Sequence, residues 1–267
     1  MMKTASTLNY VSYLKIEQLL TAQTPLSRTE DGFEHDEMLF IVIHQVYELW
    51  FKQMLHELDY LMAQMAANKP MVVLDTFRRV LTILKTLVGQ IDILETMTPL
   101  QFNSFRSFLA NSSGFQSVQF RELEFLMGHK RKAMLTHFPD GLHGKEKLEE
   151  RYRQSTLWDA FLHFLNANGR SIPHHHLTRD VTEPIKPSAE IQAILIDIYR
   201  EDPITARLCE RLLDLDEGLQ EWRYRHVKMV ARTIGSKQGT GGSAGVKYLE
   251  STIEPIWRDL WEIRAQF

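Results

Sequence analysis

Residues 31–66 read DGFEHDEMLFIVIHQVYELWFKQMLHELDYLMAQMA, and this stretch decides the fold class. Its apolar side chains recur at steps of three and four residues, which is the period of an α-helix with a buried face. The recurring positions are Leu39, Ile43, Val46, Tyr47, Trp50, Met54, Leu58, Leu61 and Met65. One long and largely buried helix is therefore predicted here.

The helical period continues along the rest of the chain. Helices are predicted at residues 72–94, 117–127, 145–152, 155–167, 188–200, 203–232 and 246–265. Alternating two-residue patterns bounded by Gly or Asn turns are missing, so little or no strand is expected. Two segments, 169–187 and 235–245, are rich in Pro or Gly and are predicted to be irregular. The pattern predicts an all-α fold, a bundle of long helices, in a single domain spanning residues 1–267 because no linker divides it.

One helix boundary can be placed closely. Thr98 is expected to be the N-cap of a helix, with Pro99 at the first helical position and Gln101 completing a capping box. Met97 and Phe102 have the spacing of a hydrophobic staple. A similar stop and restart is predicted farther along, where Asp202 should cap a helix that begins at Pro203.

The composition is that of a folded protein with no bulk attraction to polyanions. Of the 267 residues, 44% are hydrophobic and 24% are charged, a balance that supports a buried core and does not match disordered chains. The formal net charge is −3, so neither nucleic acid nor an anionic membrane surface is an expected partner. A small molecule is therefore a better candidate for the ligand than nucleic acid or a membrane surface.

Cysteine content and the start of the chain bear on location. Cys209 is the only cysteine, so no disulfide can form within the chain and a reducing, cytoplasmic location is expected. The N-terminal residues lack the apolar run of a signal peptide. The richest apolar stretch, residues 38–51, is interrupted by His44, Gln45 and Glu48, so no membrane span is expected.

Two polar side chains stand out on otherwise apolar helix faces. Phe40 and His44 are four residues apart, so an aromatic ring and an imidazole share one face; the ordinary alternative is a core histidine bonded to a neighbouring carbonyl. Arg106 shares its face with Phe102 and Leu109, which favours either a buried carboxylate partner or a ligand carboxylate. A surface arginine that covers apolar area remains an equal alternative.

A glycine-rich loop and several histidines are candidate ligand sites. Residues 239–245, GTGGSAG, could cradle an anion, but the helical pattern before them and the missing Walker lysine argue against a nucleotide, and a flexible linker is the alternative. Residues 174–176, HHH, are predicted to be solvent-exposed rather than a metal site, because adjacent histidines cannot all face one ion and no partner cluster is evident. His226 could bind haem iron, although a single histidine has no diagnostic spacing.

Four motifs occur in order along nearly the whole chain. They are HDEMLFIVIHQVYELWFKQ at 35–53, SSGFQS at 112–117, WRYRHV at 222–227 and GTGGSAG at 239–245. Together they resemble the tryptophan 2,3-dioxygenase family. The resemblance implies a haem enzyme that inserts O2 across the indole C2–C3 bond of L-tryptophan to give N-formyl-L-kynurenine, the first step of the kynurenine pathway.

Site roles follow from the same resemblance, position by position. It implies that His226 is the axial ligand of haem b iron, with Ser113, Gly114 and Gly239 also beside the cofactor. It implies that His44 meets the indole N–H, either as a positioning group or as a base. The remaining implied substrate-binding residues are Phe40, Ile41, Val42, Ile43, Phe102, Arg106, Leu109 and Thr240, where Arg106 binds the substrate carboxylate and Thr240 its amino-acid end.

The resemblance also implies an oligomer. Tyr10 and Tyr13 match tyrosines that the family lends to a neighbouring subunit's pocket, so an N-terminal arm of about residues 1–20 is expected to be exchanged within a homotetramer. Phe102 stands where some members have tyrosine, so a hydroxyl contact to the carboxylate is absent. Two rival hypotheses are a catalytically silent haem or amino-acid sensor on the same scaffold and a helical interaction protein without a cofactor.

Overall fold

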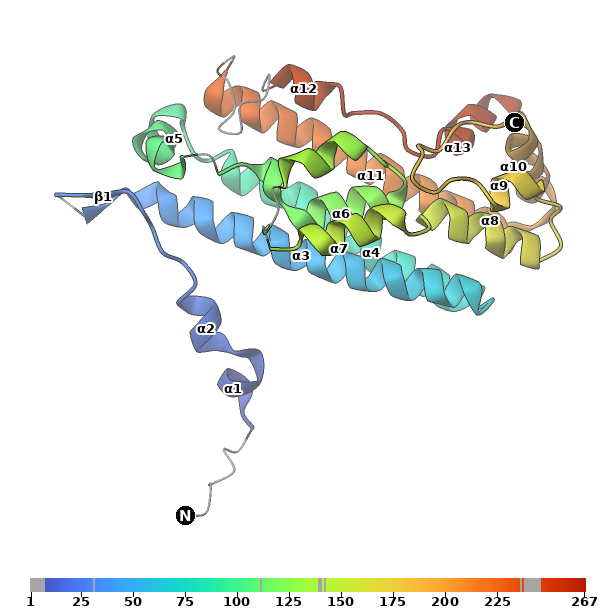
Figure 1. The fold of residues 1–267 in the computed structure, drawn as a ribbon, viewed down its shortest axis with the longest axis horizontal. Helices are drawn as coiled ribbons and strands as arrows, with labels where there is room; N and C mark the ends of the chain where they lie inside the picture. Colours follow the sequence, from blue (N-terminus) through green and yellow to red (C-terminus); the bar gives the residue numbers. More distant parts are fainter. Residues whose placement is uncertain are drawn as a thin grey trace.

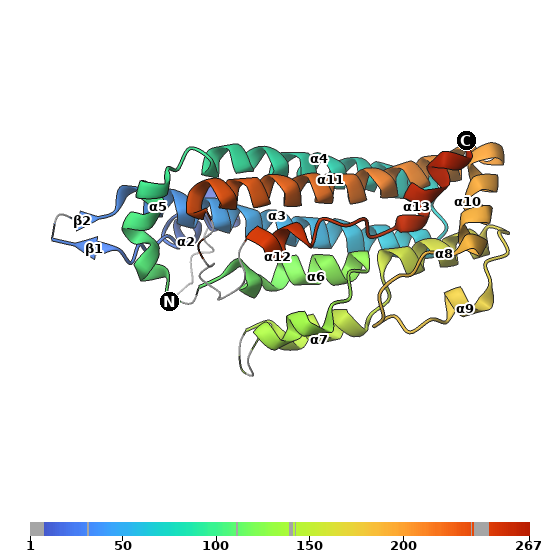
Figure 2. The same cartoon turned by 90° about the horizontal axis from the view of Figure 1, so that it is seen from above.

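A computed structural model of the chain describes residues 8–30, 32–110, 112–138, 141, 143–235, 237 and 246–267. Three long helices form its body: α3 (His35–Ala66), α4 (Pro70–Leu94) and α11 (Pro203–Ile234), which lie side by side (Figure 1, Figure 2). Within the described residues, strand occurs only in one hairpin, whose strands β1 (Arg28–Thr29) and β2 (Gly32–Phe33) have two residues each. The predicted all-α class is confirmed.

Shorter helices cover this body on one side and at both ends. Helix α6 (Val118–Met127) packs on α3, and α7 (Lys145–Arg153) packs on α6. Helix α8 (Leu157–Ala167) also packs on α3. Helix α5 (Pro99–Arg106), extended by η1 (Ser107–Leu109), crosses one end, and α10 (Ala189–Glu201) packs on α11 at the other (Figure 2). The core between the long helices is apolar, and Leu58, Phe77 and Leu212 are fully buried in it.

The helix starts follow local hydrogen bonding. Thr98 accepts from the amide of Gln101 at 3.3 Å, and the Gln101 side chain accepts from the amide of Thr98 at 2.8 Å, which confirms the predicted capping box. Met97 and Phe102 share one buried cluster, as a staple requires. Asp202 caps α11 by accepting from the amide of Thr205 at 3.1 Å, also as predicted.

The prediction of one helix over residues 246–265 is wrong. The chain there forms α12 (Val246–Glu250), a connection, α13 (Arg258–Glu262) and η4 (Ile263–Gln266). Pro255 lies in the connection, and proline cannot donate the helical hydrogen bond and disfavours helix at the residue before it. The freed amides of Ile256 and Trp257 instead donate to the buried carboxylate of Asp216 on α11, at 3.0–3.1 Å.

The segment predicted to be irregular, residues 169–187, includes one short helix, α9 (His174–Leu177). Side chains tie the rest of it to the body. Arg179 pairs with Asp159 through two nitrogen–oxygen contacts of 2.6 and 3.0 Å, and the hydroxyl of Tyr152 donates to the carbonyl of Thr182. Two 3-10 turns, η2 (Gly114–Gln116) and η3 (Lys132–His137), were likewise not expected.

The N-terminal arm leaves the body. Helices α1 (Tyr10–Leu14) and α2 (Ile16–Leu20) stand apart from the bundle in Figure 1. Residues after the arm contact α3 at two places. Gln45 accepts from the side chain of Gln23 and donates to the carbonyl of Ala22, and the buried carboxylate of Glu37, in the first turn of α3, accepts from the amides of Leu26 and Ser27 at 2.8 and 2.9 Å. None of the helices in the described ranges combines the length and apolarity needed to cross a bilayer.

Candidate functional site

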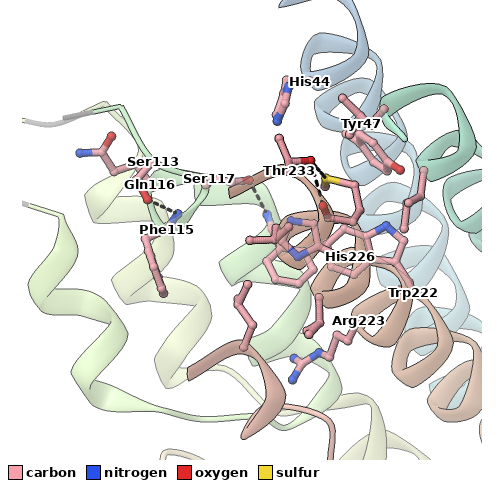
Figure 3. Close-up of a pocket in the computed structure, with 18 of the residues that line it drawn as sticks. His44, Tyr47, Ser113, Phe115, Gln116, Ser117, Trp222, Arg223, His226 and Thr233 are labelled. Carbon is pink, nitrogen blue, oxygen red and sulfur yellow. Dashed lines mark hydrogen bonds between the residues drawn. The ribbon is translucent and has the colours of Figure 1, made fainter. Parts of the chain in front are cut away.

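A cavity of about 570 Å³ lies among α3, α5, α6 and α11. That volume is within the range of pockets that hold cofactors and small ligands. Figure 3 shows how side chains from α3 and α11 face each other across it. The apolar lining includes Phe40, Tyr47, Phe51, Leu94, Phe102, Leu109, Phe120, Trp222 and Val227.

His226 projects into this cavity from the C-terminal half of α11. Its ring is stacked on that of Trp222, one helical turn earlier, with centroids 5.3 Å apart and planes 10° from parallel. Burial, with smaller contributions from the nearby His44 and Arg121, lowers the pKa of His226 to about 4. The imidazole is therefore neutral at physiological pH and keeps a nitrogen lone pair, which is the form that binds a metal.

His44 faces the cavity from α3. Its Nδ1 lies 2.6 Å from the carbonyl oxygen of Phe40. The alternative considered from the sequence, a histidine bonded to a neighbouring carbonyl, therefore describes Nδ1 correctly. The ring nevertheless lines the cavity, and its surroundings lower its pKa through burial, opposed by the bond to Phe40 and by the Glu48 carboxylate. His44 is thus a neutral donor at Nδ1 and a possible acceptor at Nε2.

Arg106 enters the cavity from the last turn of α5. Phe102, one turn before it, packs against Phe40 and Phe105 with ring centroids 5.9 and 5.4 Å away. This aromatic cluster fixes the face of α5 that turns inward, and Arg106 and Leu109 follow on that face. A guanidinium in the lining of the cavity suits a ligand with a carboxylate.

A cluster of charged side chains forms another part of the cavity wall. Glu124 on α6 accepts hydrogen bonds from Arg121 at 2.5 Å, from Arg131 at 2.8 Å and from Arg223 of α11 at 2.6 Å. Burial raises the pKa of Glu124, but the three guanidinium groups outweigh it and hold the pKa below the ordinary value. All four side chains line the cavity.

This cluster carries more positive than negative charge. Three guanidinium groups face one carboxylate, and the buried Nε atoms of Arg121, Arg131 and Arg223 have no hydrogen-bond partner within the described residues. Buried donors normally find an acceptor, so this wall is suited to an anionic group of a bound molecule. The sequence analysis did not predict this cluster. Arg121 and Glu124 are three positions apart, but Arg223 is 99 positions from Glu124, and no local pattern links residues so distant in the sequence.

The structure brings together most of the residues singled out from the sequence. Those that line the cavity are Phe40, His44, Phe102, Arg106, Leu109, Ser113, Gly114 and His226. Ile41, Val42 and Ile43 do not line it: Ile43 is buried in the main core and Val42 is exposed. Gly239 and Thr240 lie outside the described residues.

Tyr10 and Tyr13 are the remaining candidates. Both are on α1, which stands away from the body of its own chain, with 73% and 69% of their surface exposed. They therefore do not reach the cavity within one chain.

Comparison with known proteins matches this chain to one family along its length. The family model described as tryptophan 2,3-dioxygenase matches residues 2–160 and 144–267. A tryptophan 2,3-dioxygenase of Herpetosiphon aurantiacus is 61% identical over 258 residues, covering 97% of this chain and 98% of the relative. Relatives of the same name from Anaeromyxobacter sp. (strain K) and Arthrobacter sp. (strain FB24) are 49% and 40% identical, covering 98% of this chain and 97% and 93% of their own lengths.

Proposed function

The chain belongs to the tryptophan 2,3-dioxygenase family and is a dioxygenase of tryptophan, and we propose that it holds haem b at His226 and binds L-tryptophan on the side of the cavity where His44 and Arg106 lie. One observation carries this proposal. His226, His44 and Arg106 come from three different helices, and their side chains line the same cavity.

The residues of the cavity fit a haem. His226 offers a neutral imidazole to the iron, and the surplus of guanidinium groups around Glu124 suits the two carboxylates of the porphyrin. Ser113 and Gly114, at the start of η2, lie in the same lining. When bound, haem supplies the oxygen chemistry by which both atoms of O2 are inserted across the indole C2–C3 bond, leaving the protein to bind, orient and exclude water.

The amino-acid end of the substrate is assigned to Arg106. A guanidinium can hold a carboxylate through two parallel hydrogen bonds, which sets the direction of the whole ligand. Phe102 supplies a ring without a hydroxyl at this point, so we propose that the carboxylate is held without the additional donor that a tyrosine provides. Thr240 is proposed to meet the same end of the substrate.

The indole end is assigned to His44 and Phe40. Since Nδ1 of His44 donates to the carbonyl of Phe40, Nε2 is the nitrogen that can accept the indole N–H. The ring of Phe40 lies 4.1 Å from that of His44, centroid to centroid, and offers an apolar wall for the indole. Fixing both ends of the substrate holds the C2–C3 bond in one place, and such positioning lowers the barrier by several kcal/mol.

We also propose the assembly and location. The chain forms one domain whose N-terminal arm, about residues 1–20, passes to a neighbouring subunit, where Tyr10 and Tyr13 complete the pocket of a homotetramer. The exposure of these tyrosines on an arm that leaves its own body supports this. A cytoplasmic location agrees with a single, buried cysteine, Cys209.

The activity assay uses haem-loaded, reduced protein with L-tryptophan and ¹⁸O2. We expect N-formyl-L-kynurenine that carries both labelled oxygen atoms. Haem binding without product would contradict the proposal and favour the silent sensor, while incorporation of a single labelled atom would contradict dioxygenation. Within the described residues no feature favours either rival hypothesis.

A further inference from the structure

Three potential metal ligands meet at the end of the bundle away from the cavity, where α9 lies beside the start of α10 (Figure 2). Nε2 of His175 lies 3.2 Å from Oε2 of Glu190, and Nε2 of His176 lies 3.5 Å from the same oxygen. No two of the three ligand atoms are more than 4.8 Å apart. This group is separate from the residues that line the cavity.

The spacing is that of ligands around one ion. Nitrogen and oxygen atoms bound tetrahedrally at ~2.0–2.1 Å from Zn²⁺ lie about 3.3–3.4 Å from each other. The two nitrogen–oxygen separations of 3.2 and 3.5 Å bracket that value, so the carboxylate oxygen already lies at the distance of a second ligand from each imidazole nitrogen. Two imidazoles and one carboxylate are also a ligand set that Zn²⁺ uses, with water in the fourth position.

The backbone on both sides of the group is held in place. Ser188, the N-cap of α10, donates its amide to Asp259 at 2.8 Å, and Arg179, two residues after α9, pairs with the buried Asp159. Ligands on segments whose positions are already set lose less freedom when an ion binds. His175 and Glu190 are exposed, so an ion can enter from solvent, while the side chain of His176 is largely covered.

We propose that His175, His176 and Glu190 form a Zn²⁺ site that fastens α9 to α10. From the sequence, three adjacent histidines are not expected to share one ion, and His174 is indeed outside this group. That expectation did not consider Glu190, which supplies a third ligand atom beside His175 and His176. Nε2 of His176 also lies 3.0 Å from the hydroxyl of Ser188, a hydrogen bond that the ion replaces.

The test is a zinc titration of the haem-loaded protein, in which His226 is occupied by iron, after removal of loosely bound metal with a chelator. Calorimetry should show a single saturable Zn²⁺ site per chain, and zinc K-edge absorption should show two imidazoles in the first shell. Zn²⁺ should also raise the melting temperature. His175→Ala and Glu190→Gln should each weaken binding by at least roughly tenfold, the loss that removing even a supporting partner of a ligand causes.

His174→Ala is the matched control, because His174 is on the same helical turn but outside the group. It should bind Zn²⁺ as the unchanged protein does. Circular dichroism and the Soret band check that each variant folds, and Glu190→Gln changes neither size nor hydrogen-bonding reach. The proposal is overturned if the unchanged protein shows no saturable site, or if either ligand variant binds Zn²⁺ as tightly as His174→Ala.

Discussion

Nδ1 of His44 lies 2.6 Å from the carbonyl oxygen of Phe40, its neighbour one turn earlier on α3. A carbonyl can only accept, so Nδ1 carries the proton. Because burial lowers the pKa of His44, the ring is neutral and its other nitrogen, Nε2, is left as an acceptor. The helix that carries His44 thereby sets the tautomer that suits an indole N–H.

His44→Ala should reduce kcat without abolishing turnover. A neutral hydrogen bond contributes about 0.5–1.5 kcal/mol, which corresponds to roughly a 2- to 10-fold change in rate. Steady-state kinetics with L-tryptophan measure this. A substrate methylated at the indole nitrogen cannot make the bond, so the variant and the unchanged protein should differ little with it. Complete loss of turnover with normal substrate binding would instead identify His44 as an essential base.

His226→Ala should abolish stable haem binding. His226 is the cavity-lining imidazole on α11, and alanine has no ligand atom to replace it. Spectrophotometric haem titration should show loss of the Soret band, with partial recovery when free imidazole is added. His129→Ala is the control, since His129 is also a largely covered histidine with a pKa near 4 but does not line the cavity. An unchanged spectrum for His226→Ala would refute the assignment.

Arg106→Ala should raise KM for L-tryptophan far more than it lowers kcat. Losing a charge-paired hydrogen bond costs about 2–5 kcal/mol of binding free energy. Tryptamine lacks the carboxylate, so its KM should be nearly the same in the variant and the unchanged protein. Arg225→Ala, which removes a guanidinium paired with Asp92 on the outside of α11, is the control. Equal effects on both substrates would show that Arg106 acts on the pocket's structure rather than on the carboxylate.

Glu124→Gln should destabilise the haem-free protein strongly. Removing one partner of a buried ion cluster costs about 3–5 kcal/mol, because Arg121, Arg131 and Arg223 then lose their shared counter-charge. Denaturant unfolding measures the loss. If porphyrin carboxylates face this wall, haem should reduce the difference between variant and unchanged protein. Glu149→Gln, in partly exposed ion pairs, should cost at most about 1 kcal/mol.

The hydrogen bonds that Glu37 accepts from the amides of Leu26 and Ser27 should be lost in acid. Burial raises the pKa of Glu37, but hydrogen bonds from Leu26 and Ser27 outweigh it and hold the pKa below the ordinary 4.5. A lowered folded-state pKa means that the carboxylate's contribution is complete above 4.5 and is lost as the pH falls through the folded value. Hydrogen exchange of the Leu26 and Ser27 amides, corrected for intrinsic rates, should show protection falling in that range.

In Glu37→Gln the same amides should be poorly protected already at neutral pH, with no further loss on acidification. Glu34→Gln is the matched control, because the amides of Leu26 and Ser27 donate to the carboxylate of Glu37 and not to that of the nearby Glu34. Protection that is independent of pH in the unchanged protein would contradict the role given to Glu37.

Local features of the chain were predictable from its sequence. The helical period of α3, the capping box at Thr98 and the cap at Asp202 depend on groups three or four positions apart, so short-range pattern is enough to find them. Four motifs identified the family, and two of them contain His44 and His226. Arg106 lies outside these motifs, on the helix whose start the capping box at Thr98 predicts. The one large local error, a continuous helix through Pro255, came from giving the apolar period more weight than proline's missing N–H.

Only the tertiary structure decided which distant residues share a wall. Glu124 meets Arg223 because α6 and α11 both pack beside the cavity, and the carboxylate of Asp216 holds the amides after Pro255 because that segment returns along α11. Glu190 reaches His175 and His176 because the connection formed by residues 178–188 brings α9 beside the start of α10. Periodicity describes one helix face at a time, whereas ion clusters and metal ligands depend on how faces from different helices are set against each other.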